Sequence, residues 1–200
     1  EHGVTEMVTG TDLIIEQIRV AMGEELSFKQ EDIRIKGHAI ECRINAEIPE
    51  KNFMPSPGVV QHMHLPAGNG VRVDTALYTG YKIPSEYDSM IAKVIVHAPD
   101  REAALQKMRS ALDEMVVMGV ETNLDFQYQI MKNQVFCDGK ADTGFIENVL
   151  KIKGNDHICP ILYGLSQCFL CQIQSQKHVA DLICIISCEK SYVIPVLCCI

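Results

Sequence analysis

Hydrophobic positions follow two different periods along the first 150 residues. Between Leu13 and Met22 they recur every three or four residues, which predicts a helix with one apolar stripe. Thr11 or Asp12 would cap this helix, and Gly23 would end it. From 33 to 47 the apolar positions tend to alternate, which predicts a strand. One face of that strand reads Ile, Cys, Ile and Ala at 40, 42, 44 and 46, and the other reads Glu, Arg, Asn and Glu at 41, 43, 45 and 47.

Further strands and helices follow in two blocks. Short β-like runs at 59–65, 71–75 and 93–97 are separated by Gly, Pro and Asn, while the three prolines of 48–58 predict a loop. A helix opens at Pro99-Asp100 and ends before Gly119, and its apolar stripe extends to position 116. Thr122 would cap a shorter helix to about position 131. Because strands precede helices, the order predicts an α+β fold with an antiparallel sheet.

The polar face of the strand at 41–47 carries the clearest candidate chemistry. An arginine held between carboxylates stays cationic and keeps one orientation. Arg43 could therefore bind a carboxylate-like anion through paired hydrogen bonds or stabilise a developing oxyanion. The alternative is a solvent-facing side of the sheet with cross-strand ion pairs. Spacing alone leaves both interpretations open.

Three other groups of polar residues have ordinary structural explanations. Spacing alone places the acids and the imidazole of Glu1, His2 and Glu6 at the surface. Tyr87-Asp88-Ser89 has the composition of a turn, with side chains suited to capping. His62 and His64 share a strand face, but no third ligand stands at a useful spacing, so we expect strand residues and assign no metal ligand.

Net charge and composition exclude several classes of protein. The formal net charge is −8, which disfavours nucleic acid and anionic membranes as partners. No basic and apolar signal segment follows Glu1, and residues 157–176 lack charge but contain four glutamines, which argues against a membrane span. Only two cysteines lie in the first 150 residues, as expected in a reducing, cytoplasmic compartment.

Seven runs resemble the consecutive motifs of the biotin carboxylase family. They are EHGVTEMVTG at 1–10, GHAIECRINAE at 37–47, PSPG at 55–58, GVRVD at 70–74, YDSMIAK at 87–93, GVETN at 119–123 and DTGF at 142–145. The resemblance covers about residues 1–149, and the number and order of its motifs make it highly specific. It implies the end of an ATP-grasp domain at 1–34, the biotin carboxylase C-terminal domain at 35–149 and an unassigned tail at 150–200.

The resemblance also implies an activity. Biotin carboxylase is an ATP-dependent ligase that carboxylates carrier-bound biotin with bicarbonate, the first half-reaction of acetyl-CoA carboxylase in fatty acid synthesis. ATP, magnesium or manganese, and biotin are the implied cofactors. A biotin carboxyl carrier protein, carboxyltransferase subunits and a second copy of the chain are the implied partners. Carboxylases acting on pyruvate or propionyl-CoA share the module, so the motifs fit those complexes too.

Four residues match functional positions of the family. Glu1 matches the glutamate proposed as the base that acts on bicarbonate, and Arg43 matches the arginine that contacts bicarbonate and biotin and stabilises the biotin enolate. Asp88 matches an aspartate near that pocket, which would orient the basic residues. Arg72 matches a position of the dimer interface. The match to Arg43 agrees with the chemistry of the strand face described above.

The chain also departs from the family pattern. Gly3 replaces a usual proline, Asn69 replaces an aromatic residue that helps the dimer contact, and Ser85 interrupts a usual Pro-Pro pair. The nucleotide-binding lobes precede Glu1 in family members, so we expect this chain alone to be inactive. Alternatives are a non-catalytic module that binds carboxylase subunits, and another ATP-grasp ligase such as a carbamoyl-phosphate-forming enzyme. The run at 37–47 argues against a carbamoyl-phosphate-forming enzyme, because it resembles the C-terminal domain of biotin-dependent carboxylases.

The tail has a different composition. Residues 1–150 contain 14 Lys/Arg and 23 Asp/Glu, whereas residues 151–200 contain four and three and hold seven of the nine cysteines. Cys168, Cys171, Cys184 and Cys188 have a spacing compatible with a zinc site. The interpretation we favour is an extension foreign to the family that is poorly ordered.

Overall fold

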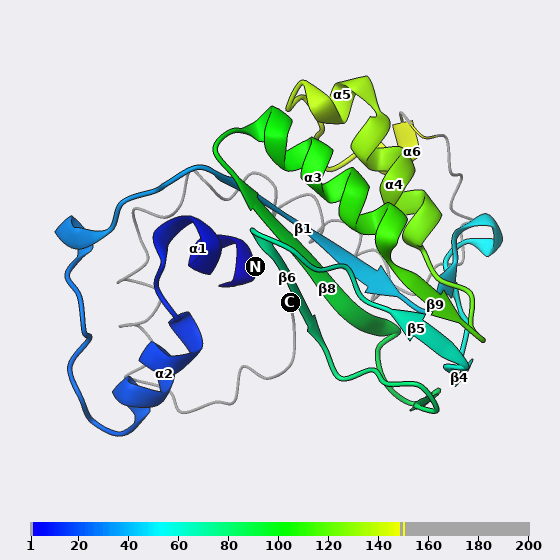
Figure 1. Ribbon diagram of the computed structural model, residues 1–200, viewed down its shortest axis with the longest axis horizontal. Coiled ribbons are helices and arrows are strands. Elements are labelled where there is room, and N and C mark those ends of the chain that lie inside the picture. Colours follow the sequence, from blue (N-terminus) through cyan, green and yellow to red (C-terminus); the bar gives the residue numbers. More distant parts are fainter. Residues whose placement is uncertain (1, 149, 151–200) are drawn as a thin grey trace.

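The computed structural model describes residues 2–148 and 150 of the chain (Figure 1). Within that part, in chain order, the elements are α1 (His2–Thr9), α2 (Leu13–Ala21), the 3-10 turn η1 (Gln30–Asp32), β1 (His38–Asn45), β2 (Glu47–Ile48), the 3-10 turn η2 (Pro49–Lys51), β3 (Met54–Pro55), β4 (Gly58–Val59), β5 (His62–His64), β6 (Val71–Thr75), β7 (Lys82–Ile83), β8 (Met90–Ala98), α3 (Arg101–Glu114), β9 (Val116–Met118), α4 (Leu124–Lys132), α5 (Gln134–Cys137) and α6 (Phe145–Asn148). None of the helices in this part has the length and apolar character needed to cross a bilayer.

An antiparallel three-stranded sheet in the order β1-β8-β6 forms the centre of the molecule. Strands β2 and β3, β4 and β7, and β5 and β9 form three smaller antiparallel pairs. The helices α3 and α4 lie together on one side of the sheet, and α1 packs against β1 and β8 (Figure 1). The predicted α+β class with an antiparallel sheet is confirmed.

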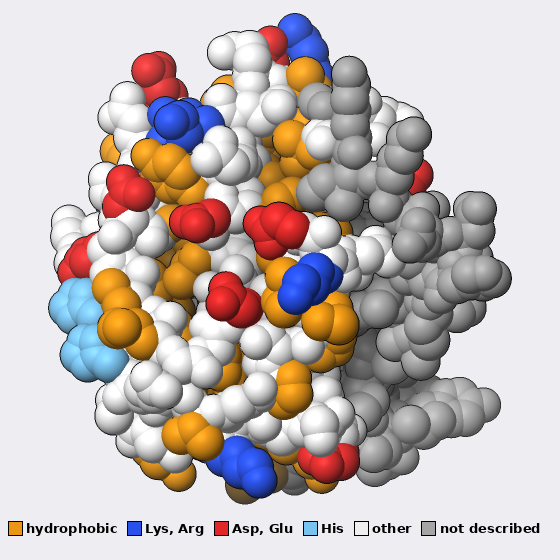
Figure 2. Space-filling view, turned by 90° about the vertical axis from the view of Figure 1, so that its right-hand side faces the viewer, with side chains coloured by type: hydrophobic (Ala, Val, Ile, Leu, Met, Phe, Trp, Pro, Cys, Tyr) orange, Lys and Arg blue, Asp and Glu red, His pale blue; other side chains and the backbone are white. Residues whose placement is uncertain are grey.

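The surface of the described part mixes charge with hydrophobic side chains. On the face shown in Figure 2, acidic side chains lie among exposed hydrophobic ones and form no continuous charged patch. Exposed hydrophobic residues across the molecule include Met54, Val59, Val116 and Met118. Single apolar residues of this kind are normal on protein surfaces.

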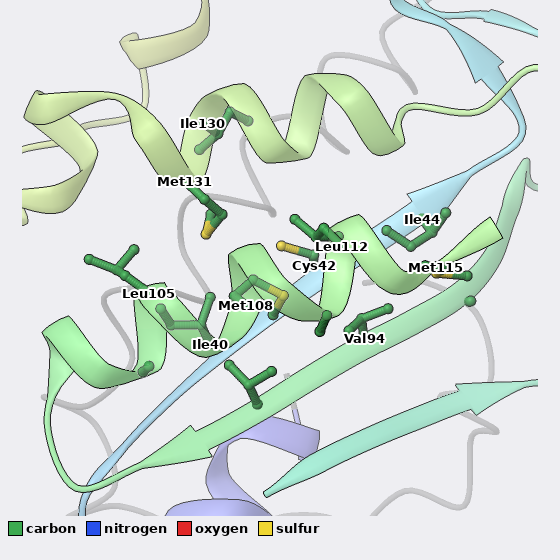
Figure 3. Close-up of a cluster of buried hydrophobic side chains, with 14 of the residues drawn as sticks. Ile40, Cys42, Ile44, Val94, Leu105, Met108, Leu112, Met115, Ile130 and Met131 are labelled. Carbon is green, nitrogen blue, oxygen red and sulfur yellow. The ribbon is translucent and has the colours of Figure 1, made fainter. Parts of the chain in front are cut away.

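The alternation along β1 places its apolar residues under the helices. Ile40, Cys42 and Ile44 are almost completely buried and meet side chains of α3 such as Met108 and Leu112 (Figure 3). Fully burying a side chain of this size contributes about 1.5–3 kcal/mol. The alternate apolar residues of β1 and the apolar stripe of α3 therefore pack into the same core, and both patterns are those that the sequence predicts.

Two helix ends differ from the prediction. Asp100 caps α3, since its Oδ1 accepts the N–H of Ala103 at 2.9 Å, but the helix ends at Glu114. The residues that follow form β9, which pairs with β5. For α4, Asn123 takes the cap position that we expected for Thr122. In both cases a partner distant in sequence sets the boundary.

The helix α2 forms where predicted but presents its apolar stripe to solvent. Asp12 caps it by accepting the N–H of Ile15 at 2.9 Å. Ile14 and Ile18 are 44% and 55% exposed, because no other described element covers them. The residue that α2 buries is Glu16, whose carboxylate accepts hydrogen bonds from Arg19 and from the backbone and hydroxyl of Ser27.

Candidate functional site

The polar face of β1 is buried rather than solvent-facing. Glu41 is 2% exposed, Arg43 8% and Glu47 4%. The interpretation of this face as an exposed row of ion pairs is therefore wrong. Burying charged groups is costly unless they are paired, so such a face is unusual for a sheet that only stabilises the fold.

The same face continues across the sheet in two rows. Arg43 lies opposite Lys93 on β8, and Lys93 lies opposite Asp74 on β6. In the neighbouring row Glu41 lies opposite Ile95, and Ile95 lies opposite Arg72. Since side chains alternate along a strand, all six point to one side of the sheet.

The helix α1 covers part of this polar face. An ideal Cβ on Gly3 would lie 2.4 Å from Cδ1 of Ile95 and 3.0 Å from Oε2 of Glu41, so the helix backbone approaches these residues closely. Val4 and Val8 are the buried apolar contacts of α1. Helix α1, which begins directly after Glu1, therefore forms one wall of the site.

Helix α4 holds the backbone of β1 at Arg43. The side-chain amides of Asn123 and Gln127 donate to the carbonyl of Arg43 at 3.2 and 3.1 Å. Oδ1 of Asn123 accepts the N–H of Asn45 at 2.9 Å. Because β1 is an edge strand of the described sheet, these backbone groups have no neighbouring strand there to bond, and the two amides take its place. We call this arrangement the α4 clamp; it fixes the backbone from which the Arg43 side chain projects.

A second polar group closes the end of β1. The Ser89 hydroxyl donates a short hydrogen bond to Glu47, and Nδ2 of Asn45 donates to the same oxygen at 3.2 Å. Burial raises the pKa of Glu47, the hydrogen bonds from Ser89 and Asn45 oppose that shift, and the nearby Asp88 carboxylate adds to it. Asp88 itself is exposed, and its Oδ1 accepts the N–H of Met90 at 2.8 Å, which is a turn contact.

Arg72 connects α1 to the edge strand β6. Its Nε and Nη2 donate to the two oxygens of Asp74 at 2.8 and 2.7 Å, and its Nη1 donates to Glu6 at 2.6 Å. These bonds, to Asp74 and then to Glu6, raise the pKa of Arg72. Glu6 also contacts Nδ1 of His2 at 3.2 Å and accepts the N–H of Leu13 at 3.1 Å. The Glu6 side chain is 9% exposed, so placing it at the surface was wrong.

The remaining candidates lie apart from this face or outside the described residues. His62 and His64 are exposed on β5, and Nε2 of His64 lies 3.2 Å from Oε1 of Glu114. In residues 2–148 and 150, no three His, Cys, Asp or Glu side chains form a group able to hold a metal ion. Glu1, the four tail cysteines considered as zinc ligands and the predicted lack of order in residues 151–200 all lie outside the described residues.

Sequence reasoning found Arg43 but missed the residues around it. Lys93, Asn123, Gln127 and Ser89 form or support the face. Lys93 stands in the largely apolar run of β8 and ends the motif YDSMIAK, which also contains Ser89, but neither residue was assigned to the site. Asn123 ends the motif GVETN, but nothing in the sequence linked either amide of the clamp to β1, because α4 lies about 80 residues from β1 in the chain.

Comparison with known proteins identifies the chain in two segments. Residues 41–148 match the family described as biotin carboxylase C-terminal domain, and residues 1–29 match the carbamoyl-phosphate synthase L chain ATP binding domain. The first match contains Arg43, the α4 clamp and Lys93, and the second contains the start of α1. The whole polar face thus falls within the matched regions.

Individual relatives agree with these matches. Biotin carboxylase of Pseudomonas aeruginosa is 53% identical over 150 residues, which are 75% of this chain and 33% of that protein. A pyruvate carboxylase subunit of Methanothermobacter thermautotrophicus is 52% identical over 147 residues, 74% of this chain and 30% of that protein. A crystal structure shows the biotin carboxylase domain dimer of Hydrogenobacter thermophilus 2-oxoglutarate carboxylase in complex with MgADP, ADP and bicarbonate. Its chain is 47% identical to this one, with a TM-score of 0.74. The match covers 78% of this chain and 35% of that chain.

The chain spans about one third of the length of the curated relatives it matches. The matched third includes the C-terminal domain and the end of the ATP-binding domain. This chain belongs to the biotin carboxylase family, whose members are ATP-dependent ligases.

Proposed function

We propose that this chain is the C-terminal part of a biotin carboxylase that uses ATP and bicarbonate to carboxylate biotin on a carrier protein. The observation that carries the proposal is the burial of Arg43 on a polar sheet face, with its backbone held by the α4 clamp. A guanidinium in a fixed position offers paired donors to a planar anion and stabilises negative charge as it develops.

Each matched residue has a proposed role in this reaction. Arg43 binds bicarbonate and the biotin ureido oxygen, Glu1 acts as the base on bicarbonate, and Asp88 orients the basic residues. When bound, MgATP or MnATP supplies the phosphoryl group that activates bicarbonate. This sequence contains no glycine-rich phosphate loop. We assign nucleotide and metal binding mainly to the two thirds of the relatives that this chain does not match, and expect the chain alone to be inactive.

The proposed partners follow from the same family. They are a biotin carboxyl carrier protein, carboxyltransferase subunits and a second copy of the chain that meets the first near Arg72. A related biotin carboxylase domain was crystallised as a dimer, which supports this last partner. We propose a cytoplasmic acetyl-CoA carboxylase as the parent complex. A pyruvate carboxylase subunit and a 2-oxoglutarate carboxylase domain are also similar to this chain. The molecule that finally accepts the carboxyl group is therefore the less specific part of the proposal.

A chimeric enzyme tests the proposal. Residues 1–148 replace the matching third of the Pseudomonas aeruginosa biotin carboxylase, and bicarbonate-dependent ATP hydrolysis is measured with free biotin. We expect activity in the chimera and a loss of about 100- to 1,000-fold in kcat for Arg43→Met. The exposed Arg34 provides the matched control, Arg34→Met, because its guanidinium donates to the backbone carbonyls of Glu31 and Ile33 and to no described residue of the β1 face.

A folded chimera without activity would contradict the proposal. If that chimera still bound the carrier protein or a carboxyltransferase subunit, the chain would instead be a non-catalytic interaction module. Circular dichroism and the thermal midpoint of each variant show whether it is folded.

A further inference from the structure

Lys93 lies beside Arg43 on the polar face of the sheet. The two residues are directly opposite each other in the antiparallel register of β1 and β8. Directly opposed residues in such a pair have Cα atoms about 4.5–5.5 Å apart. Ile95, two residues further along β8, meets α1 at Gly3, so Lys93 points to the same side of the sheet as Arg43 and α1.

The ammonium group of Lys93 has no partner among the residues that the structure describes. No hydrogen bond or ion pair joins it to any of them. Its neighbour on β6 is Asp74, but both oxygens of that carboxylate are occupied by Arg72, at 2.8 and 2.7 Å. Lys93 is nevertheless half-buried at the centre of the sheet. Its side chain is therefore partly buried without the paired carboxylate that Arg72 has in Asp74.

Two neighbouring cations on a partly buried face repel each other unless an anion lies between them. Two like side-chain charges about 4 Å apart repel each other by about 4 kcal/mol near a protein surface. Both side chains are donors only: the guanidinium offers a planar pair of N–H groups and the ammonium a compact charge with three. The ligand that suits this pair has oxygen acceptors and negative charge.

We propose that Lys93 is a second cationic residue of the site and binds, together with Arg43, an oxyanion of the reaction. This inference rests on the proposed function. The oxyanion is either bicarbonate itself or the enolate oxygen that develops on biotin when its ureido nitrogen loses a proton. In both cases Lys93 stabilises charge by a charge-assisted hydrogen bond and forms no covalent bond.

The chimera described above provides the test. Lys93→Met removes the charge, Lys93→Arg keeps it, and Lys82→Met removes an exposed lysine from β7, which belongs to another strand pair. We expect Lys93→Met to lower kcat/KM by about 10- to 100-fold, Lys93→Arg to retain most activity, and Lys82→Met to match the parent. Lys93→Gln provides a second neutral variant if Lys93→Met does not fold.

The kinetic pattern distinguishes the two oxyanions. A higher KM for bicarbonate with unchanged kcat indicates that Lys93 binds bicarbonate in the ground state. A lower kcat with unchanged KM values indicates that it acts on the charge that develops on biotin. If the neutral variants fold and match the parent in both constants, the inference is wrong while the proposed function stands. If the folded parent chimera is itself inactive, both are wrong.

Discussion

At the scale of single residues, the absence of a side chain at Gly3 sets the distance between α1 and the sheet. An ideal Cβ at this position would lie 2.4 Å from Cδ1 of Ile95, closer than real Cβ contacts allow. The biotin carboxylase motif that this segment resembles usually has proline here. The close approach brings the start of α1 onto the face that holds Glu41 and Arg43, so one glycine affects the geometry of the whole site.

We therefore expect Gly3→Ala to destabilise the protein although alanine favours helices. Overpacking costs about 1–3 kcal/mol and exceeds a propensity gain of about 0.5–1 kcal/mol. The net loss in the free energy of unfolding, measured by urea denaturation of the 200-residue chain, should be about 1 kcal/mol. Ile95→Val removes the Cδ1 atom that the new methyl group meets, so Gly3→Ala combined with Ile95→Val should recover most of the loss. A Gly3→Ala variant as stable as the parent would contradict this packing.

At the scale of elements, α4 takes the place of a fourth strand beside β1. A strand at that edge would bond the carbonyl of Arg43 and the N–H of Asn45 through its own backbone. Here Asn123 and Gln127 do so with side-chain amides. The helix that packs on the core therefore also fixes the strand that carries the candidate catalytic arginine.

Asn123→Ala should loosen this edge locally. It leaves the partly buried N–H of Asn45 without the acceptor on Asn123, which costs about 1 kcal/mol, while the carbonyl of Arg43 keeps its bond from Gln127. Hydrogen exchange followed by NMR should show faster exchange at the Asn45 amide. Gln134→Ala, at an exposed position on α5, serves as the control and should leave that amide unchanged. Unchanged protection in Asn123→Ala would show that the clamp does not hold β1.

Features that depend on contacts local in sequence were predicted correctly, whereas features that depend on contacts between distant segments were not. The hydrophobic period of β1 and the Asp100 cap of α3 are local, and both were predicted correctly. The end of α3 was not, because residues 116–118 pair with β5 more than 50 positions earlier. Arg43 was identified by its motif. The approach of α1 to the neighbouring Glu41 and the clamp from α4 both join segments far apart in the chain, so neither could be read from the residues next to Arg43 in sequence.

At the scale of the whole molecule, the described residues form a large buried core, a small cluster under α1 and an exposed face on α2. Ile44 is fully buried between β1 and the helices, whereas Ile18 of α2 is 55% exposed. These two isoleucines have similar side chains in opposite environments. They show that an apolar stripe at helical spacing predicts a helix but does not show that its stripe is covered.

The two positions should respond very differently to substitution. Ile44→Ala should lower the free energy of unfolding of the chain by about 2–5 kcal/mol, because it leaves a cavity in the core. Ile18→Ser should change it by no more than about 0.5 kcal/mol, as expected at an exposed position. Thermal or urea unfolding of both variants measures the difference. A loss of about 2 kcal/mol or more for Ile18→Ser would mean that this face is covered in the folded chain.

The strand order β1-β8-β6 has a consequence for how the chain folds as it is synthesised. The central strand β8 follows both of its neighbours in sequence, so β1 leaves the ribosome about 50 residues before its partner. At ordinary elongation rates that interval lasts roughly 3 to 10 s. During it, Ile40, Cys42 and Ile44 have neither a paired strand nor α3 to cover them, and are open to chaperones or to misassembly. Arg43 and Lys93 meet only when β8 pairs, so the step that completes the sheet brings the two cations together, and the α4 clamp can form only after it.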